Sequence, residues 1–198
     1  NDEKSISVLT QQAVSSHYLV NSYNDNEIYQ LVDENKRAYH AGISYWRKDQ
    51  NLNDTSIGIE IVNAGYVVDS IGNRVFPRFP EEQIKKIGEL VKDIATRYNI
   101  SPINILAHSD IAPTRKKDPG PMFPWKRLYT DYQVGMWYED EAKSRFMSTL
   151  LPEDFALQYN TPAFVSKVQS EFLKLGYQTP VTGIWDKPTN QTIEAFQY

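Results

Sequence analysis

A histidine and an aspartate ten positions apart, His108 and Asp118, form a pair that could bind a metal ion. Imidazole nitrogen and carboxylate oxygen are both good zinc ligands. The loop between them is stiffened by proline, so it could fold the second donor back onto the first. A catalytic zinc ion usually has three protein ligands, however, so the spacing alone favours a more ordinary interpretation: a hydrogen-bonded histidine and an aspartate that starts a proline turn.

A carboxylate and an ammonium group could supply the rest of a hydrolytic site. Glu60 lies on the polar side of an apolar strand pattern, where a carboxylate could accept a proton from an activated water molecule. Lys116, in the run Arg115-Lys116-Lys117, could donate a hydrogen bond to an oxyanion. The ordinary alternatives are a solvated strand residue for Glu60 and a solvated basic loop for Lys116.

Histidine is scarce and cysteine is absent, so a metal site can be built in few ways. The histidines are His17, His40 and His108, and any further ligand must be Asp or Glu. His17 and His40 lie among small and aromatic residues. Each could be a hydrogen-bonded core histidine or could line a cleft.

Four short apolar runs are expected to position these groups as strands. Residues 16–20 and 28–33 are separated by a polar, turn-like run and predict neighbouring strands. Residues 56–62 alternate, with Ile57, Ile59 and Ile61 on one face and Glu60 on the other. A strand predicted at residues 103–107 would deliver His108 at its carboxyl end, where open α/β sheets bind ligands.

A helix is predicted from Pro80, because apolar residues recur with a period of 3.6 along one stripe as far as Tyr98. Pro80, Glu81 and Glu82 suit its start, and Asn99 its end. A short helix is predicted near residues 125–132. The stripe is formed by Ile84, Ile87, Leu90, Val91, Ile94 and Tyr98.

Composition excludes several classes of protein. The chain has 198 residues, 40% of them hydrophobic and 23% charged, as in an ordinary globular protein of one or two domains. A net charge of -4 provides no general basic field for nucleic acid. No stretch approaches the roughly 20 apolar residues that span a bilayer, and residues 1–10 are too polar for a signal peptide.

Five separated motifs occur in a fixed order along the chain: Val14-Ser15-Ser16-His17-Tyr18-Leu19-Val20, Tyr39-His40-Ala41-Gly42, Asn53-Asp54-Thr55-Ser56-Ile57-Gly58-Ile59-Glu60, Ala107-His108-Ser109-Asp110-Ile111-Ala112-Pro113 and Lys117-Asp118-Pro119-Gly120-Pro121. Together they resemble the amidase-2 family of N-acetylmuramoyl-L-alanine amidases. The resemblance extends to about Trp137 and implies an α/β fold, with a central mixed β-sheet flanked by helices as in peptidoglycan-recognition proteins.

The resemblance implies a role for each candidate residue. His108 and Asp118 would be zinc ligands, Glu60 the general base and Lys116 the oxyanion-stabilising group. A set of four further residues would contact substrate or form the cleft wall: His17, His40, Trp46 and Arg47.

One zinc ligand of the family has no counterpart here. The family's first ligand is the histidine of a His-Tyr-Thr-type motif, and no histidine precedes His17. We expect this ligand upstream of Asn1, together with a lipid-modified cysteine that would anchor a periplasmic or cell-envelope protein to the outer membrane. The alternative is true loss of the ligand, which should weaken zinc binding severely.

The C-terminal segment resembles a truncated peptidoglycan-binding-1 domain, a small all-α unit. Matching stretches include Leu175-Gly176-Tyr177 and the run from Val181 to Trp185. We therefore expect a catalytic domain at residues 1–145, a linker at 146–161 and a helical domain at 162–198. Because such a piece has a small core, wall binding is implied by the resemblance alone.

These features predict zinc-dependent hydrolysis of the amide between N-acetylmuramic acid and L-alanine, by a monomer whose partner is peptidoglycan. The alternative is a non-catalytic peptidoglycan-recognition protein of the same fold, which the missing histidine keeps open. A metalloprotease is disfavoured because the sequence contains no His-Glu-x-x-His motif.

Overall fold

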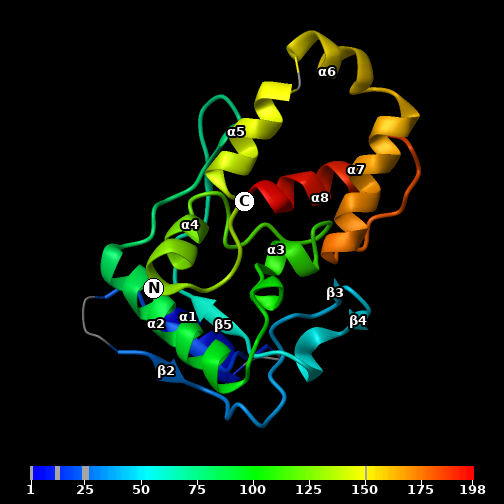
Figure 1. The fold of residues 1–198 in the computed structure, drawn as a ribbon. Coiled ribbons are helices and arrows are strands. Elements are labelled where there is room, and N and C mark those ends of the chain that lie inside the picture. The colour runs from blue at the N-terminus through cyan, green and yellow to red at the C-terminus, as the bar shows by residue number, and fades with distance from the viewer. Residues whose placement is uncertain (1, 12–13, 24–26, 150) are drawn as a thin grey trace.

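A three-stranded mixed sheet lies at the centre of the computed structural model, which describes residues 2–11, 14–23, 27–149 and 151–198 (Figure 1). Strand β1 (Tyr18–Val20) pairs antiparallel with β2 (Tyr29–Gln30) and parallel with β5 (Ile59–Ile61). Three of the four predicted strands are therefore present, although each is shorter than its apolar run.

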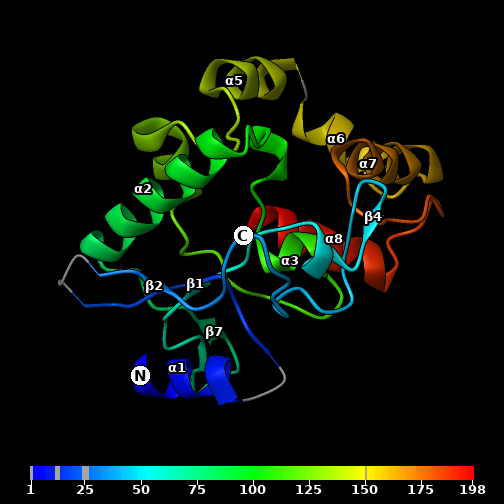
Figure 2. The same cartoon turned by 90° about the horizontal axis from the view of Figure 1, so that it is seen from below.

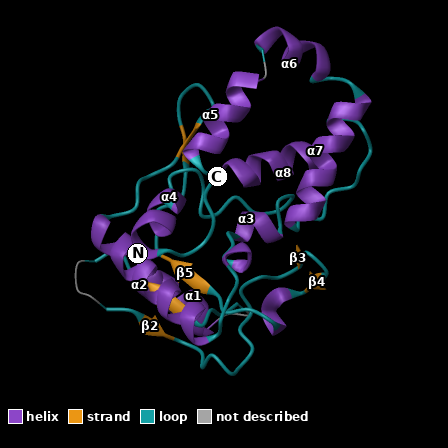
Figure 3. Ribbon diagram, in the orientation of Figure 1, coloured by secondary structure: helices purple, strands orange, loops and turns teal. Residues whose placement is uncertain are grey.

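Helices cover the sheet from both sides. Helix α2 (Glu81–Arg97) lies along one side and α1 (Asp2–Gln11) on the other (Figures 1 and 2). The Gln83 side-chain amide ties α2 to the sheet region, because it donates to the carbonyls of Val20 at 3.2 Å and Val62 at 2.8 Å. The predicted fold class is confirmed: a mixed sheet flanked by helices, with a helical C-terminal part (Figure 3).

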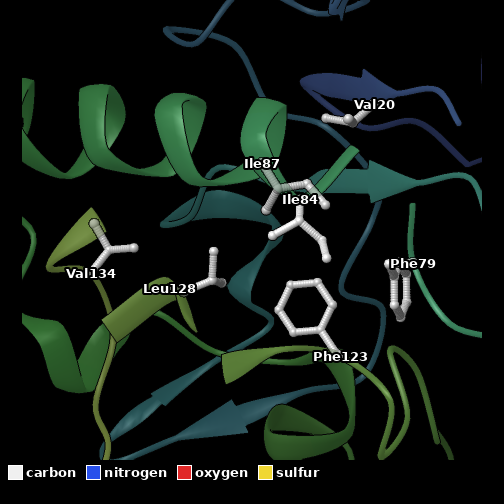
Figure 4. Packing of buried hydrophobic residues seen from close by; sticks show 7 residues of the cluster. All are labelled: Val20, Phe79, Ile84, Ile87, Phe123, Leu128 and Val134. Carbon is white, nitrogen blue, oxygen red and sulfur yellow. The ribbon is translucent and has the colours of Figure 1, made fainter. Parts of the chain in front are cut away.

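Helix α2 buries most of the predicted apolar stripe, but Tyr98 at its end is 46% exposed. It begins after Pro80, and Asn99, with φ 50°, lies just beyond its end. Lys86 is not part of the stripe, yet it is only 4% exposed, with its ammonium bonded to Asn21 and to the Tyr23 carbonyl. The core beneath α2 (Figure 4) is formed by Val20, Phe79, Ile84, Ile87, Phe123, Leu128 and Val134.

The strand predicted at residues 103–107 is not part of the described sheet. A 3₁₀ turn, Pro102–Asn104, is followed by extended backbone at Ile105 and Ala107. The Ala107 amide donates to the Asp110 carboxylate at 2.8 Å instead of to a neighbouring strand. Helix α3 (His108–Ile111) starts immediately afterwards. His108 therefore lies in the first turn of a short helix rather than at a strand end.

Short hairpins and turns complete the N-terminal part. One hairpin pairs β3 (Tyr45–Trp46) with β4 (Asp49–Gln50), and the other pairs β6 (Val67–Val68) with β7 (Arg74–Val75). A 3₁₀ turn spans Leu52–Asp54. The short helix predicted near residues 125–132 is present as α4 (Trp125–Arg127), continued by a π-helical turn, Leu128–Tyr132.

The C-terminal half of the described chain is helical. The connection predicted at residues 146–161 contains the end of α5 (Asp140–Thr149) and all of α6 (Pro152–Gln158), both largely exposed. Helices α7 (Pro162–Leu175) and α8 (Lys187–Gln197) follow, each capped by a side chain, Thr161 or Asp186. We call residues 162–198 the C-terminal unit; the domain boundaries themselves stay a prediction. None of the helices placed by the structure is long and apolar enough to cross a membrane.

Candidate active site

The loop between His108 and Asp118 folds back so that the two predicted donors meet. Nδ1 of His108 lies 2.9 Å from Oδ2 of Asp118. The Ser109 amide donates to the Asp118 carbonyl at 3.0 Å, which closes the loop at its base. We call residues 108–118 the ligand loop. The structure thus brings together two donors that sequence spacing alone left in doubt.

The Ala41 carbonyl determines which ring nitrogen of His108 carries a hydrogen and which is left to face Asp118. Nε2 of His108 lies 3.2 Å from the Ala41 carbonyl, which can only accept, so Nε2 carries the hydrogen. Nδ1 therefore donates to the Asp118 carboxylate when the ring is protonated, and presents its lone pair to the same carboxylate when the ring is neutral. Two ligands bound about 2.1 Å from one tetrahedral ion lie roughly 3.4 Å apart, so a small opening of this pair would admit a cation.

The pair accounts for only part of a metal shell. Within residues 2–11, 14–23, 27–149 and 151–198, no group of three or more His, Cys, Asp or Glu side chains is arranged to hold an ion. His108 and Asp118 fit the donor chemistry of a zinc site. A third protein ligand is not among the residues that the structure describes.

Glu60 and Lys116 act electrostatically on the same region. Partial desolvation, followed by the nearby Asp118 charge, raises the pKa of the Glu60 carboxyl, while His108 and Lys116 oppose the rise. Desolvation also pushes the pKa of Asp118 upward, but hydrogen bonding and charge from His108, helped by Lys116, outweigh it and lower that pKa. The four predicted residues therefore surround one site, although they come from β5 and the ligand loop.

His17 is a buried structural residue. It is 1% exposed, and both ring nitrogens are bonded to backbone: Nε2 donates to the Lys36 carbonyl at 2.9 Å, and Nδ1 accepts from the Gly58 amide at 3.0 Å. The ring thereby ties β1 to the segment that leads into β5. Its burial places it behind the cleft wall rather than in contact with a ligand.

His40 packs against His17, with ring centroids 5.5 Å apart. Burial, reinforced by the charges of His17 and His108 and opposed by a hydrogen bond with Ser56, lowers the pKa of His40 to about 4. Its Nε2 is buried without a hydrogen-bond partner in the described part of the chain. His40 is therefore neutral near pH 7, with one unused nitrogen.

Trp46 and Arg47 contact the C-terminal unit. The Trp46 side chain is buried, and its ring lies 5.1 Å from that of Tyr177 in an edge-to-face arrangement. The Arg47 amide donates to the Gly176 carbonyl at 2.7 Å. These contacts give Trp46 a packing role, and the part expected for it in substrate contact or in the cleft wall stays a prediction.

Arg115 is a residue of the site that sequence reasoning missed. Its guanidinium donates to the carbonyls of Ala41 at 2.8 Å and Ile43 at 2.9 Å. Because the Ala41 carbonyl also meets His108, Arg115 fixes the segment after His40 against the ligand loop. The run of three basic residues was a signal for this role, but only Lys116 was singled out within it.

The fold and the grouping of an imidazole, two carboxylates and an ammonium are those of a hydrolytic enzyme of the α/β class. A family model described as N-acetylmuramoyl-L-alanine amidase matches residues 1–121, and the chain belongs to this family. The enzyme class predicted from the sequence is thereby confirmed.

Individual relatives agree with this membership. The chain is 39% identical to N-acetylmuramoyl-L-alanine amidase AmiD of Escherichia coli (strain K12) over 200 residues, which is 98% of this chain and 69% of AmiD. It is 39% identical to 1,6-anhydro-N-acetylmuramyl-L-alanine amidase AmpD of Enterobacter cloacae over 105 residues, 53% of this chain and 51% of AmpD.

Solved structures match the whole described fold. Escherichia coli AmiD, in complex with the substrate anhydro-N-acetylmuramic acid-L-Ala-D-gamma-Glu-L-Lys, gives a TM-score of 0.85 at 38% identity, covering 100% of this chain and 75% of AmiD. AmpDh3 of Pseudomonas aeruginosa gives 0.81 at 36% identity, covering 98% of this chain and 76% of that protein. The likeness therefore includes the C-terminal unit, whose resemblance to a peptidoglycan-binding domain stays a prediction.

Proposed function

We propose that this protein hydrolyses the amide bond between N-acetylmuramic acid and L-alanine in bacterial peptidoglycan. The observation that carries the proposal is the convergence of His108 and Asp118 at 2.9 Å, beside Glu60 and Lys116. Family membership supports it, as do the muropeptide ligands of two similar structures, AmiD and the AmpDh3 complex with anhydromuramic pentapeptide.

Zinc is the proposed cofactor, held in part by Nδ1 of His108 and a carboxylate oxygen of Asp118. When bound, it would polarise the amide carbonyl and lower the pKa of a water molecule. The Ala41 carbonyl keeps the hydrogen on Nε2 of His108 and so leaves Nδ1 free to coordinate.

Glu60 transfers the proton in the proposed reaction, and Lys116 stabilises the negative charge that develops on the substrate. The Glu60 carboxylate accepts a proton from the attacking water, and its raised pKa brings it closer to the range that suits a general base near neutral pH. The Lys116 ammonium donates a hydrogen bond to the carbonyl oxygen as that oxygen gains negative charge. The carbon–nitrogen bond then breaks, and Glu60 returns the proton to the departing amine of L-alanine.

His40 and its neighbours are proposed to line the substrate cleft. Tyr39 and Ile43, which flank His40 and Ala41, are 52% and 84% exposed, so this segment presents apolar surface next to the ligand loop. His17 supports the segment from behind, through its contact with the His40 ring. Of the two other candidates, Trp46 is buried, so any direct contact with substrate falls to Arg47.

The proposed substrate implies the setting in which the protein works. Peptidoglycan is extracytoplasmic, so the protein would act in the periplasm or cell envelope, and we propose that it does so as a monomer. A net charge of -4 gives it no general attraction for nucleic acid. Peptidoglycan fragments are therefore the proposed partners.

Glu60→Gln tests the proposal, because the amide keeps the shape of the side chain and removes its basicity. We expect the release of stem peptides from purified peptidoglycan to fall by a factor of about 10²–10⁴. Mass spectrometry of the soluble products gives the rate, and Glu89→Gln, on the exposed side of α2, is the matched control. A Glu60→Gln protein that cleaves at the parent rate would remove Glu60 from the mechanism.

The same assay tests the alternative of a non-catalytic recognition protein. That alternative is favoured by the finding of only two converging metal donors among the described residues. It predicts that the parent protein sediments with peptidoglycan and releases no stem peptide at any zinc concentration. Hydrolysis supports the amidase and excludes the recognition protein.

A further inference from the structure

The C-terminal unit contacts the helix that begins with His108. The Tyr177 hydroxyl donates to Oδ1 of Asp110 at 2.5 Å, and Tyr177 is only 3% exposed. The other Asp110 oxygen, Oδ2, accepts from the amide of Ala107 at 2.8 Å. One carboxylate thus joins the C-terminal unit to the backbone immediately before His108.

A second contact reaches the other end of the ligand loop. Oε2 of Glu194, on α8, lies 2.5 Å from the ammonium of Lys117, and Oε1 lies 2.9 Å from the guanidinium of Arg74. Lys117 stands between Lys116 and Asp118 in the chain. In the middle of the ligand loop, the side-chain amide of Gln191, on α8, donates to the Thr114 carbonyl at 3.3 Å.

The C-terminal unit packs tightly against Trp46, so the two parts cannot shift relative to each other without a clash. A Cβ atom built on Gly176 would lie 2.7 Å from the Trp46 ring, so only glycine allows this approach. The Tyr177 ring packs edge-to-face on both Trp46 and Phe172. Figures 1 and 2 show α8 lying beside α3.

We infer that Tyr177 and Glu194 are positioning residues for the candidate active site: Tyr177 acts on His108 through Asp110, and Glu194 acts on Asp118 and Lys116 through Lys117. This inference rests on the proposed function. It makes the C-terminal unit a structural part of the amidase site, whether or not that unit also binds the cell wall.

Two conservative variants of the full chain test the inference. Tyr177→Phe keeps the ring packing and removes only the donated hydroxyl, while Glu194→Gln keeps the shape and removes the charge. Tyr159→Phe and Glu171→Gln are matched controls: Tyr159 follows α6, and Glu171 pairs with Lys174 within α7. Zinc affinity is measured by competition with a chromophoric chelator, and kcat and KM on a soluble anhydro-muropeptide, which requires no attachment to the wall.

We expect both variants to weaken zinc binding on the order of tenfold and to lower kcat with little change in KM, as for residues that orient metal ligands. Hydrogen exchange followed by mass spectrometry should show faster exchange at residues 105–118 and unchanged exchange in α2. Parental zinc affinity, kcat and exchange in both variants would overturn the inference.

Hydrogen exchange also distinguishes failure of this inference from failure of the proposed function. A parent protein that binds no zinc and cleaves no muropeptide refutes the proposed function. The exchange rates of residues 105–118 in the two variants then decide by themselves whether the C-terminal unit holds the ligand loop. Faster exchange supports that role, and unchanged exchange refutes it.

Discussion

Gly58 determines how closely the buried His17 and the half-buried His40 approach the sheet. Its amide donates to His17 at 3.0 Å, and its carbonyl accepts from the His17 and Tyr18 amides. A Cβ atom at this position would lie 2.2 Å from the His40 ring. The glycine is thus required by close approach, since a side chain would occupy the volume that His40 fills.

Gly58→Ala should therefore destabilise the fold. The methyl group would force His40 out of its position, and overpacking of this kind costs about 1–3 kcal/mol. Urea unfolding at pH 7 measures the loss, with Thr55→Ala at an exposed position nearby as control. An unchanged free energy of unfolding would show that His40 can move aside without cost.

The sequence pointed to His108 and Asp118 but not to the contacts that surround them, and the catalytic roles of the site residues stay a prediction. The pairing of His108 with Asp118 follows from the family motifs and the proline-stiffened loop. The bonds from Asp110 to Tyr177 and from Arg115 to Ala41 span 67 and 74 positions. Such contacts depend on how distant elements pack, and no local spacing encodes them.

At the scale of elements, Glu34 ties the end of α2 to the sheet. Its carboxylate accepts from the Arg97 guanidinium at 2.6 and 2.7 Å, from Tyr18 of β1 at 2.6 Å and from Tyr98 at 2.8 Å. The hydrogen bonds from Arg97, helped by those from Tyr18 and Tyr98 against a desolvation cost, lower the pKa of Glu34 to about 2.

This ion pair should make stability depend on pH below neutrality. The native state binds the Glu34 proton less tightly than the unfolded chain, so the stabilisation is complete above pH ~4.5 and is lost as pH falls towards 2. Allowing for solvent screening, we expect Glu34→Gln to cost about 2 kcal/mol at pH 7 and little near pH 2. Urea unfolding at several pH values measures the difference, and equal losses at pH 7 and pH 2.5 would contradict it.

Periodicity predicted the elements that bury a continuous apolar face. Helix α2 follows its 3.6-residue stripe, and β5 follows its alternation. The run at residues 103–107 is apolar as well, but its Ala107 amide bonds to Asp110 instead of to a strand. Whether an extended run joins a sheet depends on a partner strand elsewhere, which the run itself does not specify.

At the scale of the whole molecule, the C-terminal unit has an internal polar core of its own. Gln169 is fully buried, and its amide bonds to Thr189, to the Ile184 carbonyl and to the amides of Thr182 and Gly183. This network fixes the turn between α7 and α8 independently of the ligand loop. We expect this network to preserve the turn between α7 and α8 when the contact with the rest of the protein is weakened.

Gly176→Val is the change that should separate the two parts. Its side chain would overlap Trp46, and φ +141° at this position is strained for any residue but glycine, so we expect docking to weaken by about 2–4 kcal/mol. If the Gln169 network holds the C-terminal unit together, calorimetry should show one unfolding transition in the parent and two in Gly176→Val, with faster hydrogen exchange in α3. Lys174→Ala, on the exposed side of α7, should leave a single transition. A single transition at the parent temperature in Gly176→Val would mean that the contact between Gly176 and Trp46 does not couple the two parts.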